Sequence, residues 1–284
     1  MSKLNGVIVV NKESGMTSRD VVNELVKIFN TKKIGHTGTL DPLATGVLVC
    51  TIGKFTKLNE LLTSTYKEYV ALMKLGVKTD TYDIEGKILK ETKVNLSKEE
   101  IKKVINSFKG EYDQTVPIYS SVKVKGKKLY EYARDGIEVS LPKRKVDIKE
   151  LEILSIDKDI VKFKTLVSKG TYIRSLINDI GDTLGCGAIM TSLNRTKQGL
   201  FDIADSYTLD DIKKCNYKFV DIIKCLDLYS VEVDDYLYQK IKNGSILENR
   251  YNKDLVLFKK DNEMLAIYEI YDKDKSKIKP YKMF

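Results

Sequence analysis

The sequence contains no tryptophan, and only four cysteines and one histidine, His36, in 284 residues. The cysteines are Cys50, Cys186, Cys215 and Cys225, and no two of them have CxxC spacing. With a single histidine, this spacing supports neither a zinc site nor a disulfide framework. We expect four reduced cysteines.

Long apolar runs are also missing. The longest uncharged segment, residues 42–53, has about a dozen residues, whereas a membrane-spanning helix needs roughly 20. Near the start of the chain, only residues 6–10 form an apolar stretch, which is too short for the hydrophobic region of a secretory signal. The sequence therefore predicts a cytoplasmic protein with no membrane segment.

Positive charge, by contrast, is in excess. Lys and Arg total 49 against 40 acidic residues, for a net charge of +9 and a pI near 9.0, which favours a polyanionic partner. Only six of the cations are arginines, so positions that retain Arg are enriched for sites that need a planar, bidentate donor. Arg134, Arg174 and Arg195 fall in the motifs described below.

Apolar periodicity predicts a mixed α+β fold. A 3.6-residue period predicts one helix after Thr17, another from a Ser97/Glu100 capping box to Gly110, and a third after Gly170. Alternating or β-rich segments predict strands at residues 7–10, 69–75, 161–167 and 188–193. From about residue 230 the chain changes to short strand-like pieces. We therefore expect a large domain at 1–229 and a small β-rich module at 230–284.

The segment Gly35 to Gly46, GHTGTLDPLATG, is too rich in glycine to be a regular element. Pro42 favours an extended conformation at Asp41, so the loop can display a single carboxylate. From spacing alone, an ordinary Asp-Pro turn is the favoured explanation of this segment. A phosphate-binding P-loop is excluded because no Gly-Lys-Ser/Thr follows.

This segment resembles the catalytic loop of the TruB family of pseudouridine synthases, and five further segments match family motifs in chain order. They are VVNKESGMTSRDVV (9–22), KEYVALMKLGVKTDTYD (67–83), YSSVKVKGKKLYEYAR (119–134), SKGTYIRSLI (168–177) and LNRTKQGLF (193–201). The resemblance spans about residues 4–205. It implies a central, largely antiparallel sheet flanked by helices, with a carboxy-terminal PUA-like module that contacts RNA.

The resemblance also implies an activity: isomerisation of a uridine, flipped out of the tRNA T loop, to pseudouridine. Asp41 would be the nucleophile, attacking either C6 of the ring or C1' of the sugar, without a metal or other cofactor. Arg174 would pair with Asp41, and Tyr69 would stack on the uracil and is a candidate for accepting the C5 proton. Leu193 would pack on the base from another side.

Further residues would bind the substrate. The resemblance implies contacts to the extruded nucleotide or its loop from His36, Gly38, Thr39 and Lys12. A basic segment would face the RNA backbone through Lys123, Lys125, Lys127, Lys128 and Arg134. The expected partner is the T-arm stem-loop of tRNA, bound by a monomer that requires no protein partner.

Two other functions remain open. A non-catalytic RNA chaperone would have no need of the Asp41 carboxylate. A glycosidase-like enzyme would release free base, and it normally uses paired carboxyl groups, for which Asp80 and Asp83 are candidates. The pattern TDTYD around these two residues is more typical of a turn.

Overall fold

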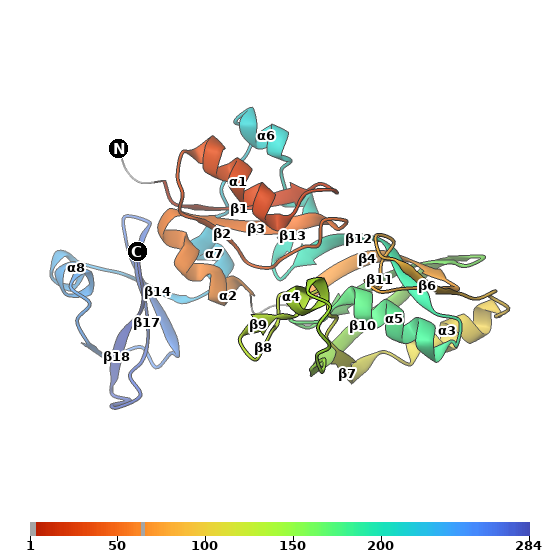
Figure 1. Ribbon diagram of the computed structural model, residues 1–284. Helices are drawn as coiled ribbons and strands as arrows, with labels where there is room; N and C mark the ends of the chain where they lie inside the picture. Colours follow the sequence, from red (N-terminus) through yellow and green to blue (C-terminus); the bar gives the residue numbers. More distant parts are fainter. Residues whose placement is uncertain (1–3, 64–65) are drawn as a thin grey trace.

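A nine-stranded sheet forms the centre of the computed structural model, which describes residues 4–63 and 66–284 (Figure 1). Its main path runs β1-β3-β12-β4-β11-β10-β7, with β2 paired to β3 and β13 to β12. All of these pairs are antiparallel except β3 with β12. The strands are β1 (Gly6–Lys12), β2 (Ile34–His36), β3 (Thr45–Ile52), β4 (Lys67–Leu75), β7 (Gly110–Thr115), β10 (Lys143–Asp157), β11 (Ile160–Val167), β12 (Ala188–Gln198) and β13 (Phe201–Asp202).

Helices and short elements surround this sheet. Figure 1 shows α1 and α6 together over the β1 end, and α3 and α5 together at the β10–β11 end. The helices are α1 (Ser18–Phe29), α2 (Asn59–Thr63), α3 (Lys98–Asn106), α4 (Leu129–Arg134), α5 (Ile173–Thr183), α6 (Leu209–Lys213) and α7 (Ile222–Leu226), with 3-10 turns η1 (Gly53–Leu58) and η2 (Ile203–Asp205). Two small hairpins pair β5 (Val77–Thr79) with β6 (Ile88–Glu91), and β8 (Lys123–Val124) with β9 (Lys127–Lys128).

The capping signals read from the sequence are confirmed. Thr17 and Asp20 form a capping box at α1, and Ser97 and Glu100 form another at α3. One predicted boundary is wrong, because α3 ends at Asn106 and Gly110 instead opens β7 with a positive φ of 97°. The glycine serves the turn into the strand rather than the helix end.

Strands β1 and β3 lack simple alternation because both of their faces are buried. Val7 and Val9 join one apolar cluster, which also includes Leu257 and Ile267, while Ile8 joins the main core on the opposite face. A strand buried on both sides reads as a continuous apolar run. By contrast, β4 alternates, and its core-facing series begins at Tyr69.

The carboxy-terminal segment forms a separate five-stranded sheet in the order β14-β16-β17-β18-β15, drawn in blue at the left of Figure 1. Its elements are β14 (Tyr229–Glu232), α8 (Asp235–Lys242), β15 (Leu247–Glu248), β16 (Leu255–Lys260), β17 (Glu263–Ile270) and β18 (Lys277–Met283). It contacts the rest of the chain through Lys57, whose Nζ donates to the Met283 carbonyl at 2.6 Å, and through the edge-to-face pair of Phe55 and Phe284.

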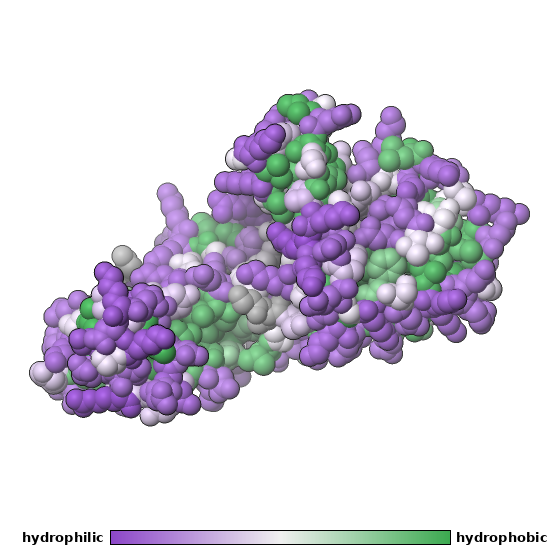
Figure 2. Space-filling view, turned by 90° about the horizontal axis from the view of Figure 1, so that it is seen from below, coloured by the Kyte–Doolittle hydropathy of each residue, from purple (hydrophilic) through white to green (hydrophobic). Residues whose placement is uncertain are grey.

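The surface seen from below in Figure 2 is mostly hydrophilic, with apolar patches where the carboxy-terminal sheet meets the larger body. Among the described residues, no helix is long and apolar enough to cross a membrane. The mixed α+β architecture predicted from the sequence is confirmed.

Helix α5 lies close to the sheet at Gly181. A Cβ atom at this position would lie 2.1 Å from the backbone nitrogen of Ala188 and 2.4 Å from the carbonyl carbon of Gly187. Any side chain here must therefore push the helix away from β12.

We expect Gly181→Ala to destabilise the protein by roughly 1–3 kcal/mol, because overpacking outweighs the helix propensity of alanine. Urea unfolding measures this free energy, with Thr183→Ala on the exposed side of α5 as the control, expected within about 0.5 kcal/mol of the parent. A gain in stability for Gly181→Ala would show that propensity, not packing, dominates at this position.

Candidate active site

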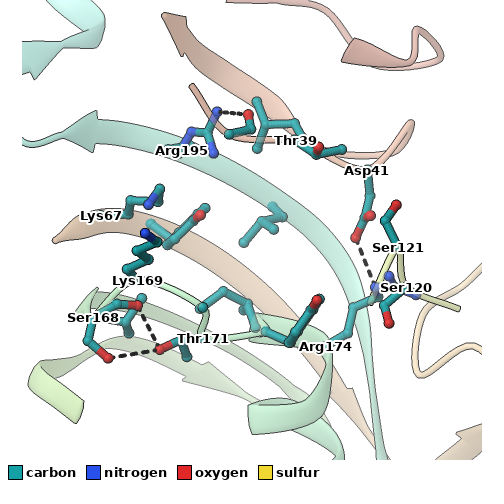
Figure 3. Close-up of a pocket in the computed structure, with 18 of the residues that line it drawn as sticks. Thr39, Asp41, Lys67, Ser120, Ser121, Ser168, Lys169, Thr171, Arg174 and Arg195 are labelled. Carbon is teal, nitrogen blue, oxygen red and sulfur yellow. Dashed lines mark hydrogen bonds and ion pairs between the residues drawn. The ribbon is translucent and has the colours of Figure 1, made fainter. Parts of the chain in front are cut away.

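A cavity of about 390 Å³ opens between the loop that precedes β3, the first turn of α5 and the segment that leads to α4. This volume is within the roughly 300–1,000 Å³ typical of ligand sites. Asp41, Tyr69, Arg174 and Leu193 all line it, so the structure brings the predicted catalytic groups together. Figure 3 labels Asp41 and Arg174 among them. Gly38 and Thr39 line it as well.

Asp41 and Arg174 form an ion pair at one end of the cavity. Arg174 Nε lies 2.9 Å from Asp41 Oδ2, although its N–H is not aimed well enough for a hydrogen bond, so the contact is chiefly ionic. The Arg174 side chain is 7% exposed and that of Asp41 is 38% exposed. The carboxylate is thus held by a buried cation and still reaches the cavity.

Arg174 is itself fixed by two separate segments. Its Nη1 donates to the Thr81 carbonyl at 3.1 Å and its Nη2 donates to the Tyr119 carbonyl at 3.0 Å. Asp83 lies 3.5 Å from Nη1 and adds a second carboxylate. These contacts explain how a cation is stabilised in the first turn of α5, where the helix dipole opposes it.

The loop that carries Asp41 is held by contacts along its length. Ser18 Oγ both donates to the Leu40 carbonyl and accepts from the Leu40 amide. At the end of the loop, Gly46 has φ 97°, and a Cβ there would lie 2.3 Å from the Arg195 carbonyl oxygen. Glycine is therefore required where the loop enters β3 beside β12.

Lys12 is not among the residues that line the cavity, and its contact with substrate stays a prediction. Its side chain is buried, and Nζ donates to the carbonyls of Glu13, Met16 and Pro42 at 2.9, 2.6 and 3.1 Å. Burial lowers the Lys12 pKa to about 8, against the opposing pull of Asp41. All three protons of the ammonium are used in these hydrogen bonds, so Lys12 links the segment after β1 to the loop that carries Asp41.

His36 lies at the end of β2 and is not among the residues that line the cavity. Burial lowers its pKa, with a smaller contribution from the Arg195 charge, so the neutral imidazole is favoured. Its Nδ1 is buried without a hydrogen-bond partner. A contact between His36 and a bound nucleotide stays a prediction.

The basic segment folds as the β8–β9 hairpin followed by α4, beside the cavity mouth. Tyr130 from α4 lines the cavity, whereas the predicted basic residues lie outside it. Lys127 pairs with Asp135 at 2.7 Å and lies over the Tyr132 ring, while Arg134 is 73% exposed. Lys128 lies over the Tyr130 ring, and Lys123 and Lys125 are exposed. Their contact with RNA stays a prediction.

Comparison with known proteins identifies the family. Residues 26–173 match the TruB family pseudouridylate synthase (N terminal domain), and residues 174–224 match the tRNA pseudouridylate synthase B C-terminal domain. The chain belongs to the TruB family. It is therefore an RNA-modifying isomerase, a pseudouridine synthase, as the motifs predicted.

Relatives match along almost the whole TruB-family chain. It is 46% identical to tRNA pseudouridine synthase B of Clostridium tetani, over 94% of this chain and 92% of the relative. It is 42% identical to the Lactobacillus acidophilus protein of the same name, over 94% of each. A solved H/ACA RNP bound to a substrate RNA containing 2'-deoxyuridine superposes with a TM-score of 0.70, at 27% identity, covering 98% of this chain and 84% of that one.

Sequence reasoning missed several residues of this TruB-family site. Arg195, noted only as part of a motif, is buried and donates from Nε to the Val47 carbonyl at 2.7 Å and from Nη2 to the Gly38 carbonyl at 3.0 Å. Lys67 and Lys169 line the cavity. Lys67 is the first residue of the 67–83 motif, so its place two residues before Tyr69 was the available signal. No sequence signal singled out Gln114.

Gln114 clamps the backbone just before α5. Its Oε1 accepts from the Tyr172 amide at 2.7 Å and its Nε2 donates to the Tyr172 carbonyl at 3.1 Å. The same Nε2 donates to the Tyr112 hydroxyl, which lies 3.4 Å from Asp179 Oδ2. Gln114 thereby positions the turn that carries Arg174, two residues further on.

We expect Gln114→Ala to lower kcat for pseudouridine formation by about tenfold, with a much smaller change in KM, because a small displacement of Arg174 acts on the chemistry more than on binding. Steady-state kinetics on a tRNA substrate measures both. Asn106→Ala, at the exposed end of α3, is the matched amide control and should change neither. A rise in KM at constant kcat would show that Gln114 does not position the reacting groups.

Asp179 should make stability depend on pH. Burial raises its pKa to about 6, above the roughly 3.9 of an unfolded chain. The native state thus binds the proton more tightly, and stability falls as pH rises from about 4 through 6. Relative to the parent, Asp179→Asn should gain about 1 kcal/mol across this window, after allowance for partial solvent access. Unfolding curves of both proteins at pH 4 and pH 7 test this. If the free energies of unfolding of Asp179→Asn and the parent differed by the same amount at both pH values, the prediction would be contradicted.

Proposed function

We propose that this chain converts a uridine in the T loop of tRNA to pseudouridine, with Asp41 as the catalytic nucleophile. The observation that carries the proposal is the Asp41–Arg174 ion pair inside a cavity lined by Tyr69 and Leu193. Relatives named tRNA pseudouridine synthase B, matched over 94% of the chain, support the choice of substrate.

The reaction breaks the bond between N1 and C1', turns the uracil and forms a new bond between C5 and C1'. A carboxylate suits both halves because it can attack C6 or C1' and later leave. Once C5 is joined to the sugar, its proton departs and N1 gains one, so the overall step is an isomerisation. Tyr69 lies in the cavity as the candidate acceptor of the C5 proton.

A uridine stacked in a folded loop is out of reach, so the enzyme must flip it out at a cost of a few kcal/mol. We propose that the hairpin residues Lys123, Lys125, Lys127 and Lys128, with Arg134, grip the backbone of the T arm and help to offset this cost. Residues 230–284 would act as a PUA-like RNA-binding module beside a catalytic domain at 1–229. We expect a monomer that needs no protein partner and acts on tRNA in the cytoplasm.

Neither Asp80 nor Asp83, the candidate pair for a base-releasing glycosidase, lines the cavity. Asp83 is 5% exposed, and its carboxylate accepts from the Glu85 amide at 3.1 Å. Asp80 accepts from the Lys87 amide at 2.8 Å. Both carboxylates therefore shape the turn before β6, as the TDTYD pattern suggested.

The test uses a T-arm stem-loop with tritium at C5 of the target uridine. We expect Asp41→Asn to reduce tritium release by at least about 1,000-fold, because the neutral amide cannot act as the nucleophile, while RNA affinity changes by only a few fold. Asp80→Asn serves as the matched carboxylate control and should release tritium at the parental rate.

Release near the parental rate by Asp41→Asn would remove this residue from the mechanism. Free uracil among the products would favour the base-releasing reaction. Tight RNA binding without any tritium release by the parent protein would favour an RNA chaperone.

A further inference from the structure

The charges that line the cavity are divided between its two ends. Asp41 is the only acidic side chain among the lining residues, and it pairs with Arg174 at one end. Figure 3 shows Lys67, Lys169 and Arg195 together at the opposite end. Three cations thus face one part of the cavity where no lining carboxylate lies near them.

Lys67 is the most constrained of these cations. It begins β4, is 8% exposed, and has Arg195 and Lys169 close enough that their charges add to the effect of burial. Together these effects lower its pKa to about 8. Gathering like charges in a poorly solvated place is costly, and an anion bound among them would relieve that cost.

Hydroxyl groups line the same end of the cavity. Ser168 and Thr171 are both lining residues, and their hydroxyl oxygens are 3.5 Å apart. The Thr171 hydroxyl donates to the Ser168 carbonyl at 2.9 Å, so the Ser168 hydroxyl is the one that could turn towards a ligand. Figure 3 shows both residues next to Lys169. Lysine together with serine and threonine hydroxyls is a common donor set for the phosphate oxygens of nucleic acids.

The spacing along β4 connects this end to the reacting base. Alternate residues of a strand point to the same face, so Lys67 and Tyr69 face the same side, about 7 Å apart. A nucleotide whose uracil stacks on Tyr69 would therefore bring its backbone towards Lys67. The lysines of the β8–β9 hairpin, by contrast, lie outside the cavity.

We propose that Lys67 and Lys169 form a phosphate subsite that binds a backbone phosphate flanking the extruded uridine. The proposal rests on the proposed function, because it takes the cavity to be the place where the uridine is held. Arg195 contributes positive charge to the subsite while its own N–H groups anchor the Val47 and Gly38 carbonyls. The subsite would fix the nucleotide by its backbone while Asp41 acts on its base.

The test couples a charge change in the protein to one in the RNA. Lys169→Gln and Lys67→Gln are made in the Asp41→Asn background, and each binds stem-loops in which one of the two phosphates flanking the target uridine is a neutral methylphosphonate. We expect each lysine variant to lose roughly 10–100-fold in affinity for the all-phosphate RNA, as for a hydrogen bond to a charged group. On the RNA in which the phosphate bound by the subsite is the neutral one, each lysine substitution should lower affinity by less than about threefold.

Lys109→Gln, at an exposed lysine between α3 and β7, is the matched control and should show the same small effect on every RNA. If both cavity variants lose equal affinity for all RNAs, or lose no more than Lys109→Gln, no such subsite exists. Should Lys67→Gln fail to fold, the exposed Lys169 carries the test alone. Absence of tritium release by the parent protein would instead reject the proposed function, since the coupling is read from binding and needs no turnover.

Discussion

The buried guanidinium of Arg174 is the constraint around which this site is built. At 7% exposure it has lost most of its water, and a desolvated cation is tolerated only where charges and carbonyl oxygens replace that water. Thr81, Tyr119, Asp83 and Asp41 provide the replacement. Three segments far apart in the sequence must therefore meet at the Arg174 side chain, and one of them brings the Asp41 carboxylate that lines the cavity.

A second arginine plays a parallel role on the opposite side of the loop. Arg195 is 1% exposed and donates hydrogen bonds to the carbonyls of Val47 and Gly38, while Lys12 donates to the Pro42 carbonyl. Both cations donate to backbone carbonyls of the loop or its flanks. The loop is glycine-rich and irregular, yet it is braced at both ends, so Asp41 can be positioned without belonging to a helix or strand.

Local signals predicted much of the fold. Caps at Thr17 and Ser97 and the apolar stripe of α5 depend on residues only a few positions apart, so the sequence alone reveals them. The motifs also predicted the meeting of Asp41, Tyr69, Arg174 and Leu193, which the structure confirms. The backbone contacts of Lys12 and Gln114 were not predicted. Lys12 binds a carbonyl 30 residues further along the chain and Gln114 binds a peptide group 58 residues further along, and neither residue type indicates which backbone group it will bind.

The apolar cluster shared by the two sheets also bears on how the protein could have changed over time. Leu257 and Ile267 of the carboxy-terminal sheet pack in the same cluster as Val7 and Val9 of the central sheet. A chain shortened before β16 would lose the part of this cluster that Leu257 and Ile267 supply, and the apolar residues that they cover would become prone to association. A lineage that dispensed with the terminal sheet would therefore have needed polar replacements among the residues of the larger body that this sheet now covers.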